Sequence, residues 1–201
     1  MAQTDHTKAA LRQRLRSERR ALTREQVAER SDEIVRHVVT APFFERARLI
    51  GLYLPFDNEV DPSSLFHQAA RAGKETFVPI VEKSTRSMRF VAYRPGDPLQ
   101  NGAYGIAEPV IDPHRTVARD MLELELVFQP LIGFDRKGCR LGFGGGYHDR
   151  ALAASRSSAT VTCVGLAYAF QEVPSLPREP HDVPMGWVVT ERGVRCCGDV
   201  G

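Results

Sequence analysis

The hydrophobic positions of the first forty residues repeat at the spacing of an amphipathic helix. Leu11 and Leu15 fall on one helical face, and a second stripe of the same period follows further along the chain. That second stripe consists of Val27, Ile34, Val35 and Val38. Thr23 followed by Gln26 is typical of a capping box at a helix start. The pattern therefore predicts two helices over about residues 7–40.

Short apolar runs then alternate with turns and a further helical pattern. The predicted strands cover residues 48–54, 75–81, 87–93, 124–131, 160–167 and 185–190. After the first strand we expect a helix over 62–72, with Asp61 as its cap and Pro62 at its first position. A strand, helix, strand unit implies parallel pairing. The alternation predicts an α/β fold, with helices on both faces of a mostly parallel sheet and the last strand at an edge.

Two segments interrupt this alternation. Prolines and glycines break every period over residues 94–120, and such long irregular segments in compact domains are usually functional or mobile. We interpret this segment as a candidate cover for an active site. Residues 174–184 contain four prolines and are expected to form a rigid coil.

The composition is that of a soluble globular protein. The 201 residues fit one domain, and the net charge of +2 is too small to indicate nucleic-acid binding. We find no apolar run near the ~20 residues of a membrane span and no apolar core of a secretory signal. The four cysteines show neither a C-x-x-C pair nor zinc spacing. We therefore expect a cytoplasmic protein with reduced cysteines, without nucleic acid or membrane partners. We also expect a monomer.

The most unusual stretch is residues 134–150. Five of the nine residues over 138–146 are glycine, which an ordinary helix or strand would not tolerate. The stretch lies between a predicted strand and a predicted helix over 147–154, where backbone N–H groups favour an anion. The flanking charges are Arg136, Lys137, Arg140 and Asp149. A polyphosphate with a divalent cation would complement them, and a glycine-rich turn without a ligand is the alternative.

The spacing excludes two common phosphate motifs. No Gly-Lys-Ser/Thr closes the glycines as in a Walker A loop, and no acidic residue after a following strand completes a dinucleotide fingerprint.

Other candidate residues lie in loops or on the first helix. Glu59 follows a strand, at the edge of the sheet where α/β proteins bind ligands, and the alternative is a solvated carboxylate. Lys8 and Arg12 share a helical face and could reach a bound phosphate. Tyr104 could offer its ring to a flat ligand or anchor its loop, and Asp182 could be a turn carboxylate. Most arginines of the first helix, Arg12, Arg14, Arg16, Arg19 and Arg20, are interpreted as a solvated face.

These residues resemble the motifs of 5-formyltetrahydrofolate cyclo-ligases, also called methenyltetrahydrofolate synthetases. The family signature is Phe-Asp, then Gly-x-Arg-Leu-Gly-x-Gly-x-Gly-Tyr-Tyr-Asp, and it stands here at 134–135 and 138–149. His148 replaces the second tyrosine. The opening Lys-x-x-Leu-Arg at 8–12, the Glu-Val at 59–60 and the Gly-Ile-x-Glu-Pro at 105–109 are also similar. The resemblance covers residues 8–191.

The resemblance implies one domain over residues 1–201, folded as a three-layer α/β/α sandwich related to sugar-phosphate isomerases and CoA transferases. It implies a ligase that forms a C–N bond, converting 5-formyltetrahydrofolate to 5,10-methenyltetrahydrofolate with ATP as co-substrate and Mg²⁺ as cofactor. The intermediate would be a phosphorylated formyl group, and the products ADP and phosphate. This reaction belongs to folate one-carbon metabolism.

The resemblance also assigns residues to roles. Catalysis would involve Tyr147 and Arg140. ATP binding would involve Lys8, Arg12, Arg140, Leu141, Gly142, Phe143, Gly144, Gly145, Gly146, Tyr147 and His148. The folate would contact Leu54, Glu59, Tyr104, Phe143, Gly144, Gly145, Gly146 and Tyr147. Mg²⁺ would be held by Asp149 and Asp182.

Two other functions remain as alternatives. The basic N-terminal helices could form an RNA-binding arm on a non-catalytic nucleotide-binding protein, although the small net charge weakens that interpretation. A sugar-phosphate isomerase on a related fold would need an acid/base pair of carboxylates and no ATP.

Overall fold

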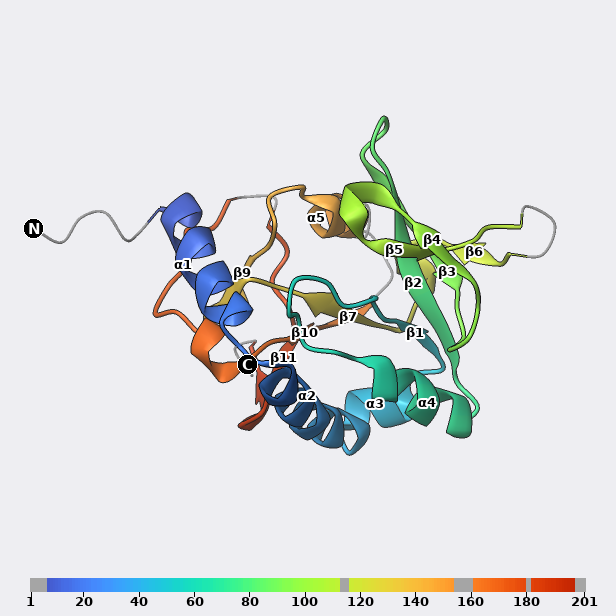
Figure 1. The fold of residues 1–201 in the computed structure, drawn as a ribbon, viewed down its shortest axis with the longest axis horizontal. Helices are drawn as coiled ribbons and strands as arrows, with labels where there is room; N and C mark the ends of the chain where they lie inside the picture. Colours follow the sequence, from blue (N-terminus) through green and yellow to red (C-terminus); the bar gives the residue numbers. More distant parts are fainter. Residues whose placement is uncertain (1–6, 113–115, 154–160, 180–181, 198–201) are drawn as a thin grey trace, which may run out of the picture.

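The computed structural model describes residues 7–112, 116–153, 161–179 and 182–197. Its centre is an eight-stranded sheet with the order β12-β11-β10-β7-β1-β2-β3-β6 (Figure 1). The strands are β1 (Leu49–Gly51), β2 (Glu75–Glu82), β3 (Ser87–Ala92), β6 (Ala118–Arg119), β7 (Leu126–Pro130), β10 (Thr162–Leu166), β11 (Trp187–Thr190) and β12 (Gly193–Cys196). The pairs β1/β2, β1/β7, β7/β10 and β10/β11 are parallel. The predicted mostly parallel sheet is thus confirmed.

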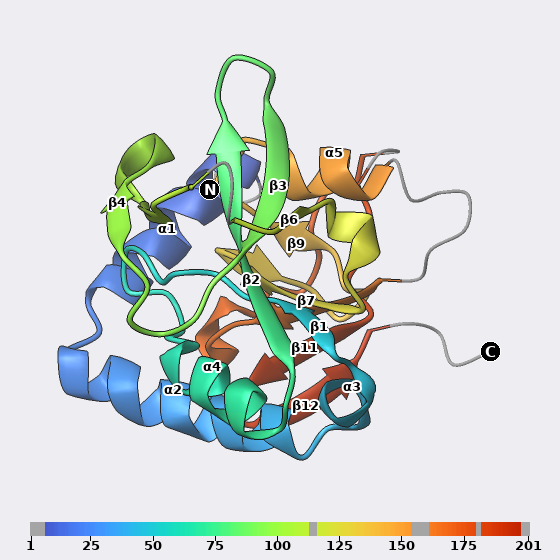
Figure 2. The same ribbon diagram turned by 90° about the vertical axis from the view of Figure 1, so that its right-hand side faces the viewer.

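Helices cover both faces of the sheet. They are α1 (Lys8–Arg20), α2 (Arg24–Val39), α3 (Pro42–Arg46), α4 (Ser63–Arg71) and α5 (Tyr147–Ala153). Figures 1 and 2 show α2, α3 and α4 together below the sheet, and α1 and α5 above it. This three-layer arrangement is the one predicted. None of the described helices is both long and apolar enough to cross a membrane.

Local sequence signals explain the two N-terminal helices. Thr7 caps α1 by accepting a hydrogen bond from the Ala10 amide at 3.2 Å. The predicted capping box of α2 is present, with Thr23 and Gln26 bonding to each other's backbone amides. The inner face of α1 is buried, and α2 packs its apolar stripe into the main core below the sheet.

The connections of the parallel strands create a point of reversal between β1 and β7. The chain leaves β1 through α4, below the sheet, to reach β2. It leaves β7 through α5, above the sheet, to reach β10 on the other side. The loops after β1 and β7 therefore separate from the sheet in opposite directions. In open α/β sheets this is where ligands bind.

Three expectations about the elements are corrected. The last predicted strand is not at the edge, because β12 pairs with β11 in antiparallel fashion and takes the edge position. The irregular segment over 94–120 contains a ribbon of β4 (Leu99–Asn101) and β5 (Ala107–Pro109), and also β6. Pro62 precedes α4 as its N-cap residue, while Asp61 Oδ1 accepts from the Ser63 amide at 2.9 Å. The ends predicted at residues 154 and 160 lie outside the described residues.

Candidate active site

The loops after β1 and β7 meet at the reversal point, and α1 lies across both of them (Figure 1). The first loop, residues 52–62, carries Asp57 and Glu59. The second contains a small ribbon of β8 (Gly133–Phe134) and β9 (Arg140–Leu141), and then the glycine loop, which we define as residues 142–146. The glycine loop leads directly into α5.

The glycine loop has the backbone geometry of an open anion site. Gly144 has a φ of +99° and Gly146 a φ of +65°, conformations that side chains rarely adopt. In the part of the chain that the structure describes, no oxygen accepts a hydrogen bond from any of the five backbone N–H groups of this loop. Helix α5 begins directly after them, at Tyr147. The loop's own amides are therefore candidate anion-binding groups.

Helix α1 presents a ladder of cations at four-residue spacing. Arg12 Nε donates to the Gly142 carbonyl at 2.8 Å, so Arg12 lies against the glycine loop, and its contact with a bound phosphate stays a prediction. Arg16 and Arg20 turn instead to the loop after β1, where both bind Asp57. An open depression of about 550 Å³ runs along this helix. It is lined by Ala9, Arg12, Gln13, Arg16, Ser17 and Arg20.

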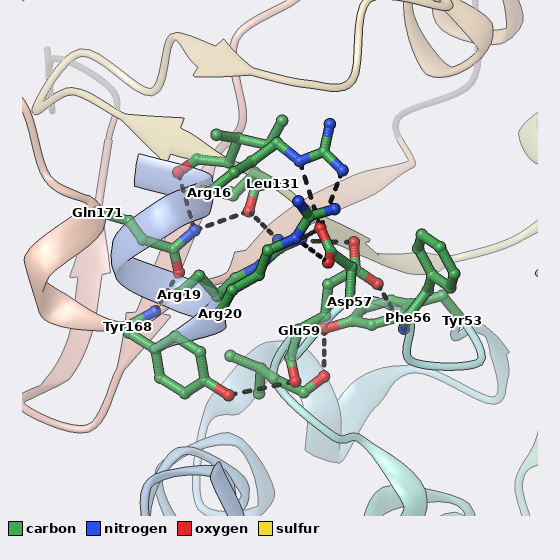
Figure 3. Close-up of polar contacts among 12 residues, drawn as sticks. Arg16, Arg19, Arg20, Tyr53, Phe56, Asp57, Glu59, Leu131, Tyr168 and Gln171 are labelled. Carbon is green, nitrogen blue, oxygen red and sulfur yellow. Dashed lines mark hydrogen bonds and ion pairs between the residues drawn. The ribbon is translucent and has the colours of Figure 1, made fainter. Parts of the chain in front are cut away.

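Asp57 is the centre of an arginine cluster (Figure 3). Its carboxylate contacts Arg16 and Arg19 at 3.1 Å each and Arg20 at 2.5 Å. Burial raises the pKa of this carboxyl, but the hydrogen bonds from Arg20 and Arg16 and the charge of Arg19 outweigh it, so the pKa lies below its ordinary value. Asp57 also has a φ of +55°, which aspartate tolerates better than most residues. The expectation that most α1 arginines form a solvated face is therefore wrong.

Glu59 is buried, with 5% of its surface exposed. Its Oε2 accepts from the Phe56 amide at 3.1 Å, and its Oε1 lies 3.8 Å from Arg19 Nη1. Burial raises the pKa of Glu59 to about 7, because desolvation outweighs the attraction of Arg19. The Tyr168 hydroxyl donates to the Glu59 carbonyl at 3.2 Å and helps to fix the loop (Figure 3). The sequence left open whether Glu59 is a solvated loop carboxylate, and its burial excludes that alternative.

Arg19 is the cation that links these two acidic residues. It is 1% exposed, and its Nε atom has no hydrogen-bond partner among the described residues. Together with Arg16, it also faces the ring of Phe143 in the glycine loop, at 5.6 and 5.3 Å from the ring centroid. Phe143 is 44% exposed, so its ring joins the two loops at the surface. This leaves a buried donor and an exposed aromatic ring beside the same depression.

The predicted metal ligands are both paired with cations. Arg140 donates to Asp149 through Nη2 and to the Val183 carbonyl through Nη1, the latter at 2.6 Å. Lys8 Nζ lies 3.5 Å from Asp182 Oδ2. Arg140 thus joins Asp149 to the segment that contains Asp182. Among the described residues, no group of three or more Asp, Glu, His or Cys side chains could hold a metal by itself.

Two tyrosines meet on the other side of the glycine loop. The hydroxyls of Tyr104 and Tyr147 lie 2.9 Å apart, and their rings are in an edge contact at 6.2 Å. The hydrogen bond between the two hydroxyls raises the pKa of Tyr147. Tyr104 is 57% exposed and has a φ of +60°. The irregular 94–120 segment therefore contacts the glycine-loop helix through Tyr104, a contact that the sequence did not indicate.

The remaining predicted residues have clear surroundings. Burial and the nearby charge of Arg140 lower the pKa of His148 to about 3, so its imidazole is neutral. Leu54 packs against the main core at the start of the Asp57 loop, and Leu141 is buried under α1. The structure thus places the predicted residues on the loops after β1 and β7, on α1 and α5, on the irregular segment with Tyr104 and on the coil with Asp182. Sequence reasoning gave no role to Asp57, Arg16, Arg19 and Arg20. The basic run of α1 was the only signal for the arginines, and the carboxylate-rich loop over 57–61 was the only signal for Asp57.

The fold and this site define an α/β protein of the kind that binds anionic small molecules at the carboxyl ends of parallel strands. The model of the 5-formyltetrahydrofolate cyclo-ligase family matches residues 4–191, and the chain belongs to that family of enzymes. It is 36% identical to the 5-formyltetrahydrofolate cyclo-ligase of Escherichia coli K12, over 88% of this chain and 96% of that protein. The Haemophilus influenzae cyclo-ligase is 32% identical over 87% and 92%.

Solved structures agree with this assignment. The 5,10-methenyltetrahydrofolate synthetase of Aquifex aeolicus superposes with a TM-score of 0.81 and 32% identity, covering 96% of this chain and 94% of that one. A synthetase from Mycoplasma pneumoniae has a TM-score of 0.73 at 24% identity and supports the fold alone. The predicted family and fold class are confirmed.

Proposed function

We propose that this enzyme converts 5-formyltetrahydrofolate to 5,10-methenyltetrahydrofolate and consumes ATP and Mg²⁺ in doing so. Family membership supports the reaction, and the glycine loop supports the nucleotide. The main observation in favour of ATP binding is that the five backbone N–H groups over 142–146 have no acceptor in the described structure. They also lie next to Arg12. Successive amides of this kind bind phosphate oxygens.

The basic residues on the nucleotide side of the site would neutralise the negative charge of the phosphates. Phosphoryl transfer depends mostly on positioning and on compensation of the phosphate charges. Arg12, which makes no ion pair with a described carboxylate, is available to a phosphate without losing one. Lys8 and Arg140 would have to exchange or share their aspartates. The neutral His148 beside Arg140 would add no charge of its own.

The donor set around Arg140 suits a shared Mg²⁺ site. Mg²⁺ is usually held by one or two carboxylates and completed by phosphate oxygens and water. Asp149 and Asp182 are such a pair, and both are partly exposed at 24% and 27%. Bound there, the ion would neutralise the phosphates and release Arg140 and Lys8 from the aspartates.

The folate side would begin at Glu59. The amino group and ring N–H of a pterin form a planar pair of donors, and an ionised Glu59 is a matching acceptor. Phe143 and Tyr104 offer exposed rings to the flat substrate. Tyr147 would position the formyl group, with its hydroxyl held by Tyr104.

The chemistry follows from the poor leaving ability of a formamide oxygen. Transfer of the γ-phosphoryl group to that oxygen makes it a phosphate ester. N10 of the folate then attacks the activated carbon, the five-membered ring closes, and phosphate leaves. Water must be kept from the intermediate, and the described part of the 94–120 segment, which contacts Tyr147 through Tyr104, would cover it.

A direct assay tests the proposal. The enzyme should form the methenyl chromophore from 5-formyltetrahydrofolate only when both ATP and Mg²⁺ are present. Turnover without ATP would support an isomerase-type reaction instead, and RNA binding without turnover would support the binding protein. We also propose that the enzyme is cytoplasmic, with its cysteines reduced, and that it acts as a monomer.

Variants of Arg140 and Asp149 test the proposed ATP and Mg²⁺ contacts. Arg140→Ala should raise the KM for ATP strongly and leave folate binding nearly unchanged. Arg14→Ala is the matched control, since Arg14 lies on α1 but pairs only with Glu18 of the same helix, at 4.0 Å. Asp149→Asn should raise the Mg²⁺ concentration needed for half-maximal rate. Unchanged ATP and metal titrations in these variants would remove both residues from the phosphate site.

A further inference from the structure

The tip of the β2–β3 hairpin lies beside the tyrosine pair. Lys83 Nζ is 4.7 Å from the centroid of the Tyr104 ring. On the other side, the Arg150 guanidinium is 5.1 Å from the centroid of the Tyr147 ring, and its Nε donates to the Arg86 carbonyl at 3.2 Å. One side of the tyrosine pair is therefore bordered by three basic residues from two separate segments.

These three basic residues differ from most other cations of the site, of which Arg12 likewise makes no ion pair with a described carboxylate. Lys8, Arg140 and the arginines around Asp57 all have carboxylate partners. Within the described residues, Lys83, Arg86 and Arg150 have none at ion-pair distance, and all three are exposed. The nearest acidic residues along the hairpin and the ribbon are occupied. Glu82 binds Ser84, and the Glu108 carboxylate faces the Val81 and Ala103 amides.

Arg150 connects this basic rim to the glycine loop. Its Nη2 donates to the Gly145 carbonyl at 2.7 Å while its Nε holds the Arg86 carbonyl. Arg86 has a φ of +52°, so the hairpin turn presents its carbonyl to Arg150 in a conformation that few non-glycine residues adopt. The rim is thus attached to the same loop that would bind the nucleotide.

We propose that Lys83, Arg86 and Arg150 bind the carboxylates of the glutamate portion of the folate substrate. This inference rests on the proposed function. A folate has a flat pterin at one end and a negatively charged glutamate at the other. Glu59 suits the pterin, and the rim, which adjoins the tyrosine pair and the glycine loop, supplies cations without a described carboxylate partner for the anionic end. Each further glutamate adds a carboxylate, so longer tails should gain affinity.

The test compares substrates that differ only in the tail. The double variant Lys83→Gln/Arg86→Asn removes two charges from the exposed turn, and asparagine tolerates the left-handed backbone at 86. Its KM for 5-formyltetrahydrofolate should rise about three- to tenfold, since exposed ion pairs are individually weak. The increase should be larger for a substrate with three glutamates and absent for 5-formyltetrahydropteroate, which lacks glutamate. The kcat and the KM for ATP should not change.

Arg89→Gln is the matched control. Arg89 is an exposed cation of the same hairpin, but it lies on β3 and pairs with Asp120 at 3.6 Å. It should leave all kinetic constants as in the wild type. An equal KM increase for the glutamate-free substrate, an equal effect of Arg89→Gln, or no effect of the double variant would each overturn the proposed rim. A wild-type enzyme that turns over none of these folates would instead overturn the proposed function and, with it, this inference.

Discussion

The burial of Glu59 leads us to predict how the stability of the folded protein depends on pH. The pKa of Glu59 rises from an ordinary 4.5 to about 7 on folding. Below its unfolded pKa the carboxyl is protonated in both states, so its burial does not lower the free energy of unfolding. Between the two values the unfolded chain is ionised while the folded chain keeps its proton, so stability falls as pH rises. Above the folded pKa the loss is complete.

The size of this loss follows from the two pKa values. Their separation corresponds to about 3 kcal/mol of unfolding free energy. In Glu59→Gln the side chain cannot ionise, so this pH dependence should disappear. Urea unfolding of both proteins between about pH 5 and about pH 8 measures the difference. Relative to the wild type, Glu59→Gln should gain most of that free energy across the interval.

A control variant and a refuting result can be told apart in the same urea unfolding experiment. Glu125 accepts hydrogen bonds from the Arg48 and Leu49 amides, which lower its pKa below the ordinary 4.5, so it is ionised in both states across this range and Glu125→Gln should differ from the wild type by an amount that does not change with pH. A difference between Glu59→Gln and wild type that stays constant with pH would show that Glu59 titrates normally in the folded protein.

Three further predictions concern residues around the site. Asp57→Asn should destabilise the protein by about 2–4 kcal/mol in urea unfolding, because it leaves the buried Arg19 without its closest anion. Tyr104→Phe should lower the pKa of Tyr147, measured by ultraviolet titration, because its raising hydrogen bond is lost. Gly138→Ala should cost about 1–3 kcal/mol, since a Cβ there would lie 2.4 Å from the Met185 carbonyl oxygen at a φ of +79°. Unchanged values in each measurement would contradict the corresponding contact.

The parts of the fold that the sequence predicted are those with local causes. The Thr23 capping box and the parallel β1–α4–β2 unit depend on neighbouring residues, and they were predicted correctly. The strands β6 and β12 were missed because they have only two and four residues, and because their pairing depends on distant partners. No local pattern marks where a short segment meets the edge of a sheet.

The site divides in the same way. The glycine loop was visible because five glycines in nine residues conflict with any regular element. The arginine cluster was not visible, because helical spacing shows which residues share a face but not what that face contacts. Arg16 and Arg19 bind Asp57, which lies about forty positions away along the chain. Asp57 stands in a left-handed backbone conformation that no sequence motif marks.

The placement of α1 has a consequence for how the enzyme matures. Leu11 and Leu15 of this first helix pack with Val173 and Leu176, from a segment near the other end of the chain. During synthesis, α1 leaves the ribosome before those residues and has no complete surface to dock on until they follow. The packing of α1 can therefore be completed only late, and a chain interrupted before residue 173 would lack part of the surface that holds this helix.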